Sequence, residues 1–346
     1  MTRWRTPTAT SCLRACWHDG RRLMGSLLLG VDGGATKTVA LIADASGTVV
    51  GAGRAGSSDI HNEVPDVGVG NVESAVRDAA AAAGVDTAEL DGCVFCLCGA
   101  DWPEDTEFYA AALQARLRLP QRPTVMNDAF GALRADTPDG VGVSLVLGTG
   151  AAIAARGPGG STWFSGERME SSGAIEFGRQ AYELLIRGEY GSGSAPSFQA
   201  AVLAAYQVAD VEGLVHEVSR TGGAGRRSLA RLAPVVLQAG HDGDPQAGAM
   251  VAEQGRVLAG YVRRAAERAL LPAVGATVVL TGGLLRHPGN DLFESVAAGL
   301  PDFMALRSER EPVYGAVMAA ADERDTDLSP DRLIASGPDP GFFHTL

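Results

Sequence analysis

Basic residues are in the minority in this sequence of 346 residues. It contains 29 Lys and Arg against 41 Asp and Glu, which gives a formal net charge of −12 at neutral pH. A protein with this charge is repelled by nucleic acid and by anionic membrane surfaces. We therefore expect neither nucleic acid nor membrane as a partner.

Long apolar runs and cysteines are also scarce. No apolar stretch is long enough to cross a bilayer, and no secretory signal precedes the first predicted strand. Three of the five cysteines, Cys93, Cys96 and Cys98, lie in one apolar segment. Cys93 and Cys96 have the spacing of a metal or redox pair, but no second pair lies nearby to complete four ligands. We expect a cytoplasmic protein in which these cysteines are small buried residues.

Two common phosphate-binding loops are absent, namely G-x-x-x-x-G-K-[ST] and a G-x-G-x-x-G that opens a helix. A different glycine-rich stretch, GVDGGATKT at 30–38, lies between apolar runs and predicts strand, tight turn and antiparallel strand. Its glycines allow close backbone approach, and the amides of such a turn suit an anion. Asp32 would repel a phosphate there unless a cation lay between them, which indicates Mg²⁺. An ordinary hairpin could close in the same way.

The chain divides into two halves with similar patterns. Residues 1–25 show no sustained periodicity, and we expect a disordered extension there. Residues 26–130 read as β-β-β-α-β-α-β and predict one lobe, a mixed sheet with helices packed on it. Residues 131–325 begin again with three short strands and predict a second lobe, whose final helix, about 312–323, could return to the first. Residues 326–346 form a C-terminal tail.

Glycine-rich turns occur at corresponding places in the two halves. In the second half, one predicted strand ends in Gly148-Thr149-Gly150, and a later strand ends in Thr281-Gly282-Gly283. Two glycine-lined turns that face each other across a cleft can hold opposite sides of one polyphosphate.

Four motifs, in this order, resemble those of the actin/hexokinase/Hsp70 superfamily over residues 27 to about 322. They are similar above all to those of N-acetylglucosamine kinases and BadF/BadG/BcrA/BcrD-type ATPases. Residues 32–38 resemble the first phosphate motif, 147–150 the second and 281–283 the adenosine motif, while 127–129 resemble the segment with the catalytic aspartate. The resemblance implies an α/β, two-lobed actin-like ATPase (ribonuclease H-like) fold, with a mixed sheet flanked by helices in each lobe and the nucleotide in the interlobe cleft.

The resemblance also implies ATP and Mg²⁺ as cofactors and assigns residues to them. Asp32 would orient the Mg²⁺ through water, and Asp128 would accept the proton of the attacking hydroxyl. Nucleotide contacts are expected from Gly33, Gly34, Thr36, Lys37, Thr38, Gly148, Thr149, Gly150, Gly282 and Gly283. Asp128 could instead be a simple helix N-cap. Because the N-terminus of a helix stabilises an anion, we expect Asp128 to be ionised at neutral pH.

The acceptor site departs from the family pattern. Family kinases have Gly-Asp-Glu-Gly-Ser after the third strand of the second lobe, where this chain has ERMESSGA at 167–174. Glu170 could replace the usual acid, or the site could serve another ligand. Acceptor contacts are expected from Ser58, Asp59, His61, Asn62, Asn127 and Glu170. For His61 a solvated loop residue is the simpler alternative.

The resemblance implies an ATP-dependent kinase of a sugar or amino sugar, most simply N-acetylglucosamine to its 6-phosphate. Three alternatives stay open. One is an ATPase that activates a partner enzyme, as in the 2-hydroxyacyl-CoA dehydratase activators, which need cysteines at a dimer interface for an iron–sulfur cluster. The others are a kinase of another sugar-like small molecule and a non-catalytic sugar sensor. The partner we expect is a small molecule, and a homodimer is possible because relatives are often dimers.

Overall fold

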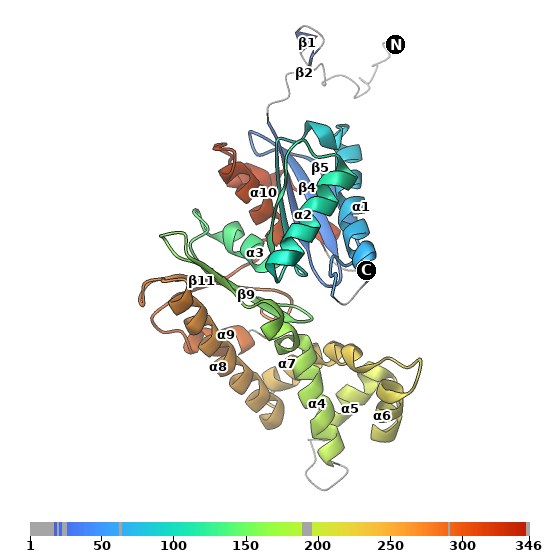
Figure 1. Ribbon diagram of the computed structural model, residues 1–346. Helices are drawn as coiled ribbons and strands as arrows, with labels where there is room; N and C mark the ends of the chain where they lie inside the picture. Colours follow the sequence, from blue (N-terminus) through green and yellow to red (C-terminus); the bar gives the residue numbers. More distant parts are fainter. Residues whose placement is uncertain are drawn as a thin grey trace, which may run out of the picture.

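Two five-stranded mixed sheets form the centres of two lobes, as expected from the sequence. Figure 1 shows this computed structural model, with one sheet in the blue and cyan part of the chain and the other in the green and orange part. Strands β1 (Trp17–His18) and β2 (Arg21–Arg22) form a separate antiparallel pair, and most of the predicted extension lies outside the described residues. The structure describes residues 17–18, 21–22, 26–61, 64–188, 196–289 and 291–343.

The first sheet has the order β5-β4-β3-β6-β7. Its strands are β3 (Leu27–Gly33), β4 (Thr38–Asp44), β5 (Val49–Ala55), β6 (Gly92–Leu97) and β7 (Thr124–Asn127). Strand β3 is antiparallel to β4 and parallel to β6, which is parallel to β7. Because the carboxyl ends of β3, β6 and β7 meet at one edge, the residues at and just beyond these ends are brought together.

Helices cover both faces of this sheet. On one face, α1 (Pro65–Ala83) and α2 (Pro103–Leu117) bury alternate side chains of β3 and β6 under residues such as Val76 and Tyr109. On the other face, α10 (Pro312–Asp322) and α11 (Pro330–Ala335) cover the remaining side chains. Burial on both faces explains why β3 and β4 are apolar except near their ends and why β6 has no charged residue.

The second sheet repeats this topology with the order β10-β9-β8-β11-β12. Its strands are β8 (Gly142–Leu147), β9 (Ala151–Arg156), β10 (Thr162–Phe164), β11 (Thr277–Thr281) and β12 (Met304–Arg307). Strand β12 was not predicted, because it is a short edge strand of four residues.

Most helices of the second lobe lie between β10 and β12 in sequence. The short helices are η2 (Gly166–Ser172) and η3 (Arg226–Leu232). The α-helices are α4 (Ala174–Gly188), α5 (Pro196–Tyr206), α6 (Val211–Ser219), α7 (Ala233–His241), α8 (Pro245–Arg268) and α9 (Asp291–Ala298). Within the ranges that the structure describes, no helix is both long enough and apolar enough to span a membrane.

Helices α3 (Asp128–Asp136) and α10 pack against each other at the junction of the lobes (Figure 1). They approach closely at Gly131 and Gly315, where a Cβ on Gly315 would lie 1.9 Å from the Gly131 carbonyl oxygen. Helix α10 packs on β3 of the first sheet, and α3 packs on β8 of the second. This pair of helices therefore sets the ends of β3 and β8 close to each other.

Candidate active site

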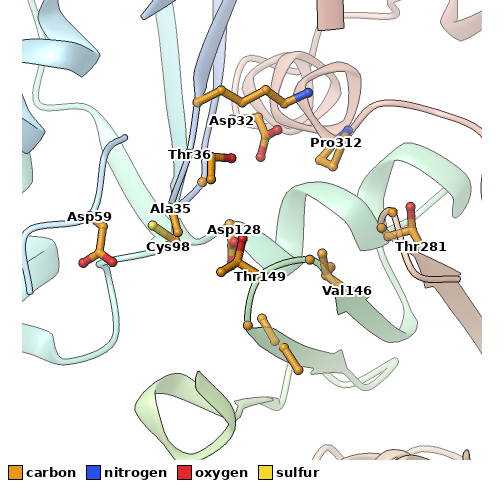
Figure 2. A pocket seen from close by; sticks show the side chains of 18 of the residues that line it. Asp32, Ala35, Thr36, Asp59, Cys98, Asp128, Val146, Thr149, Thr281 and Pro312 are labelled. Atoms are coloured by element: carbon orange, nitrogen blue, oxygen red, sulfur yellow. The ribbon is translucent and has the colours of Figure 1, made fainter. Parts of the chain in front are cut away.

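A cavity of about 440 Å³ lies where the two lobes meet. In Figure 2, Asp32, Thr36 and Asp59 come from the first lobe, Val146, Thr149 and Thr281 from the second, and Asp128 from the helix between them. The lining residues include Asp32, Gly34, Thr36, Lys37, Asp59, Cys98, Asp101, Asn127, Asp128, Gly148, Thr149, Gly150, Gly166, Arg227, Thr281, Gly282, Gly283, Arg286, Glu311 and Phe343. Thus all four predicted motifs contribute to one cavity.

The first glycine-rich turn connects β3 to β4. The Gly34 amide donates to the Lys37 carbonyl at 2.8 Å, which closes the turn and leaves its tip on the cavity. Gly33 is packed against Ser58 and does not line the cavity. The buried Thr38 hydroxyl donates to the Gly56 carbonyl at 2.8 Å. Gly33 and Thr38, two of the predicted nucleotide contacts, therefore pack behind the turn and do not line the cavity.

The second glycine-rich turn connects β8 to β9. The Gly148 amide donates to the Gly150 carbonyl at 3.0 Å, so this amide also closes its own turn. The first amides of α4 hold the turn from the other side, because Ala174 donates to the Gly148 carbonyl and Ile175 to that of Thr149. The turn is therefore fixed before any ligand binds.

Asp128 is the first residue of α3, and the N-cap is its neighbour Asn127. The Asn127 side-chain oxygen accepts from the Ala129 amide at 3.2 Å, and its amide nitrogen donates to Asp101 at 2.9 Å. The Asp128 Oδ1 atom is buried, and within the described part of the chain it has no hydrogen-bond partner. Capping thus falls to Asn127, and one carboxylate oxygen of Asp128 remains for a ligand.

The pKa of Asp128 is raised to about 8. The main cause is burial, and the nearby carboxyl groups of Asp32 and Asp101 also raise it. The backbone amides at the start of α3 lower this pKa but do not outweigh burial. Our expectation that the helix N-terminus keeps Asp128 ionised at neutral pH is wrong for the protein without ligands. The free-energy cost of removing the carboxylate from water is larger than the stabilisation that the helix N-terminus gives to its charge.

Burial also raises the pKa of Asp32, to about 7. The charges of Lys37 and Arg286 lower this pKa, whereas Glu311 raises it. Two buried carboxyl groups with high pKa values, one with an unpaired oxygen, fit a divalent cation, whose charge favours the ionised form of both. Among the described residues no three His, Cys, Asp or Glu side chains cluster as metal ligands, so Mg²⁺ here would keep water or phosphate oxygens as ligands.

The predicted acceptor residues separate in the structure. Asp59 and Asn127 line the cavity, whereas Ser58 is fully buried and packs against Gly33. His61 does not line the cavity, and its ring lies 3.1 Å from Asp105 at the start of α2.

The structure does not describe the side chains at two predicted acceptor positions. Asn62 lies outside the described residues altogether. The backbone of Glu170 belongs to η2, but its side chain is outside what the structure describes.

Several cavity residues were not predicted. Asp101 and Cys98 follow the carboxyl end of β6, so their position beside a parallel strand end was a signal that could have identified them. Burial and the Asp128 carboxyl raise the pKa of the Cys98 thiol well above its usual range. Residues from distant segments, which no local pattern indicates, are Arg227, Arg286, Glu311 and Phe343.

Comparison with known proteins identifies a family that matches most of the chain. The sequence model of the BadF/BadG/BcrA/BcrD ATPase family matches residues 29–320. A search of curated protein sequences found no match.

Solved structures share the fold. A proposed N-acetylglucosamine kinase from Chromobacterium violaceum is 23% identical with a TM-score of 0.67, covering 85% of this chain and 98% of that chain. A second proposed N-acetylglucosamine kinase, from Porphyromonas gingivalis, is 19% identical with a TM-score of 0.63, covering 86% and 99%. A ROK family glucokinase from Streptomyces griseus, in complex with glucose and AMPPNP, is 18% identical with a TM-score of 0.55, covering 87% and 100%.

Proposed function

The chain belongs to the BadF/BadG/BcrA/BcrD ATPase family, and on this basis we propose that it is an ATP-dependent kinase of a sugar or amino sugar. The observation that carries the proposal is the buried, unpaired Oδ1 atom of Asp128 in a cavity that also contains both glycine-rich turns. Hydrolysis of ATP by water has less need of the further carboxylates, Asp59 and Asp101, that line the same cavity beside the phosphate turns.

Asp128 is the general base of the proposed reaction. It accepts the proton of the acceptor hydroxyl as the oxygen attacks the terminal phosphate. A base is most effective when its pKa is near the working pH, and a pKa of about 8 meets that requirement better than an ordinary aspartate would. Asn127 and Asp101 hold the start of α3 in place through their 2.9 Å hydrogen bond.

The two turns bind the phosphates in this proposal. Amides at their tips, around Thr36 and Thr149, and the ammonium group of Lys37 supply the donors. Asp32 holds Mg²⁺ through water, and the bound ion neutralises charge on the phosphates. Gly282 and Gly283, after β11, bind the adenosine.

The part of the cavity that we assign to the acceptor is rich in hydrogen-bond acceptors. Asp59, Asp101 and the side chain of Asn127 line it, and carboxylates accept hydrogen bonds from several hydroxyl groups at once. This favours a polyhydroxylated ligand, most simply N-acetylglucosamine phosphorylated at its 6-hydroxyl. Similarity in fold to structures named as N-acetylglucosamine kinases supports this choice.

The alternative of a partner-activating ATPase has less support. Cys93 and Cys96 are buried in β6, and Cys98 lies in the cavity wall. These three cysteines are therefore not placed to hold an iron–sulfur cluster between two copies of the chain. Cys12 and Cys16 lie outside the described residues.

The test is ADP release with Mg²⁺ and ATP over a panel of sugars and amino sugars. We expect at least one of them to stimulate ADP release, with its phosphorylated product found by mass spectrometry. The control variants are Asp128→Asn, which should lose the stimulation, and Asp78→Asn, which changes an exposed carboxyl of α1 and should keep it. Equal ADP release with and without every sugar would reject the kinase.

A further inference from the structure

Lys37 has a special position in this protein, because it is the only lysine among the 29 basic residues. It lies in the first glycine-rich turn and lines the cavity. Its ammonium group has two partners, both from the C-terminal part of the chain. One is the carbonyl oxygen of Phe343, to which it donates a hydrogen bond, and the other is Glu311, whose Oε2 atom lies 3.5 Å away.

The C-terminal segment that carries Phe343 is packed into the first lobe. Leu333 of α11 and Phe343 of η4 (Pro340–Phe343) are buried in the core under α10. The ring of Phe343 packs edge-on against Tyr314, with 5.8 Å between centroids. The Phe342 carbonyl accepts a hydrogen bond from Arg54 of β5 at 3.2 Å. The segment is therefore held by both α10 and β5.

The path of the segment also depends on a close approach at Gly337. A Cβ there would lie 2.0 Å from the hydroxyl oxygen of Tyr314. Because the Tyr314 ring in turn supports Phe343, any larger residue at 337 has to displace the ring, the segment or both.

Glu311, the second partner of Lys37, is fixed as well. Its Oε1 atom accepts a hydrogen bond from Arg286 at 2.7 Å. Arg286 also donates to the Ser308 and Arg310 carbonyls, at 3.0 Å and 2.6 Å. The guanidinium group therefore holds the Glu311 carboxylate in one position, with Oε2 toward Lys37.

An ammonium group has three N–H donors. With one donated to Phe343 and one directed at Glu311, a third remains for an anion. The long lysine side chain is otherwise flexible, and a side chain that is already ordered loses less entropy when it binds a ligand.

We propose that the C-terminal segment, residues 338–343, is a functional part of the nucleotide site: together with Glu311, it positions the ammonium group of Lys37 to bind a phosphate of the nucleotide. Phe343 is a positioning residue in this scheme and contacts the phosphate only through Lys37. The inference rests on the proposed function in one respect, which is that the bound anion is a nucleotide polyphosphate. It does not depend on the identity of the acceptor.

The test is a double-mutant cycle in the affinity for ATP and for adenosine, measured by calorimetry with Mg²⁺. The variants are full-length Gly337→Val, which displaces the segment, Lys37→Met, and the two combined, with Gly159→Ala as control because a Cβ there meets nothing within 4 Å. We expect Gly337→Val to weaken ATP binding about tenfold, or about 1.4 kcal/mol. We expect Lys37→Met to weaken ATP binding at least as much. In both single variants the affinity for adenosine should stay within about twofold of that of wild type.

The combined variant decides between a positioning role and a merely structural one. If the segment acts through Lys37, the combined variant binds ATP no more weakly than Lys37→Met alone. Additive losses, an equal loss for adenosine, or unchanged ATP affinity in Gly337→Val would each overturn the proposal. These measurements need no acceptor, so they stand even if no sugar in the panel is phosphorylated.

A second measurement does not depend on ligand affinity. Because the chain has one lysine, selective ¹⁵N-lysine labelling gives a single side-chain ammonium signal. We expect this signal to be shifted from that of free lysine in the wild-type protein, to return toward it in full-length Gly337→Val, and to move on addition of ATP. A signal at the free-lysine position in both proteins would contradict the contact with Phe343.

Discussion

Replacement of Asp128 by asparagine tests the proposed base directly. The side chain keeps its shape, and α3 keeps its N-cap, because Asn127 supplies the capping oxygen. We therefore expect normal folding and ATP binding, with kcat lower by about 10²–10⁴-fold, or about 3–5 kcal/mol in activation free energy.

The same variant has a pH-dependent effect on stability whose sign follows from the pKa. The pKa of Asp128 is raised from an ordinary value of 3.8 to about 8 in the folded protein. Between these values the folded state holds a proton that the unfolded state has released, so wild-type stability falls as the pH rises, by up to about 1.4 kcal/mol per pH unit. Asparagine has no such proton, so Asp128→Asn should gain melting temperature relative to wild type from pH 5 to pH 8.

The assay is thermal unfolding of both proteins at several pH values, together with sugar-dependent ADP release. Asn127→Ala serves as the comparison, since the loss of the cap should cost about 0.5–2 kcal/mol of stability with little change between pH 5 and pH 8. A constant difference in melting temperature between Asp128→Asn and wild type would mean that the Asp128 carboxyl ionises as an ordinary aspartate does. A kcat close to that of wild type would remove Asp128 from the reaction.

Further predictions concern the neighbouring carboxyl groups and the thiols. Asp32→Asn should raise the Mg²⁺ concentration needed for half-maximal turnover more than tenfold without a change in acceptor affinity, and an unchanged Mg²⁺ titration would reject its role in metal binding. Asp59→Asn should raise the acceptor KM by about one to two decades, from the loss of about 1.5–3 kcal/mol for a charge-assisted hydrogen bond, and an unchanged KM would place the acceptor elsewhere in the cavity. The acid limb of kcat/KM against pH should lie near 7–8, because Asp128 acts in its ionised form, and a limb near pH 4 would contradict this. With Cys12 and Cys16 changed to serine, a thiol reagent at pH 8 should react with the protein only after denaturation. The reason is that burial raises the pKa of the Cys93, Cys96 and Cys98 thiols, and rapid reaction of the native protein would contradict this.

Local patterns in the sequence predicted most of the fold. The turn after Asp32 lies between two apolar runs, and such a pattern specifies strand, turn and strand without help from the rest of the chain. The resemblance of residues 127–129 to a family segment identified Asp128, and local pattern placed it between a short strand and a helix with an apolar face. The sequence did not predict which residue is the N-cap of α3, because Asn and Asp cap a helix about equally well and stand next to each other here.

The electrostatic state of these residues depended on tertiary structure. Local sequence places Asp128 at the positive end of a helix, which favours the ionised form. Only the assembled cavity shows that Asp32 and Asp101 are near it and that burial dominates its pKa. Desolvation is a property of everything packed around a group, and no pattern of neighbouring residues measures it.

By itself the sequence determined the two glycine-rich turns, the strand that presents Asp32 and the helix start that presents Asp128, because turn chemistry and hydrophobic period act over a few residues. The tertiary structure alone decided which distant residues complete the site. Lys37 meets Phe343 across 306 positions of sequence, and Arg286 meets Glu311 because the segments that carry them follow the neighbouring parallel strands β11 and β12. Such contacts arise from burial of apolar faces on both sides of one sheet, and the polar groups that meet there are a consequence of that packing.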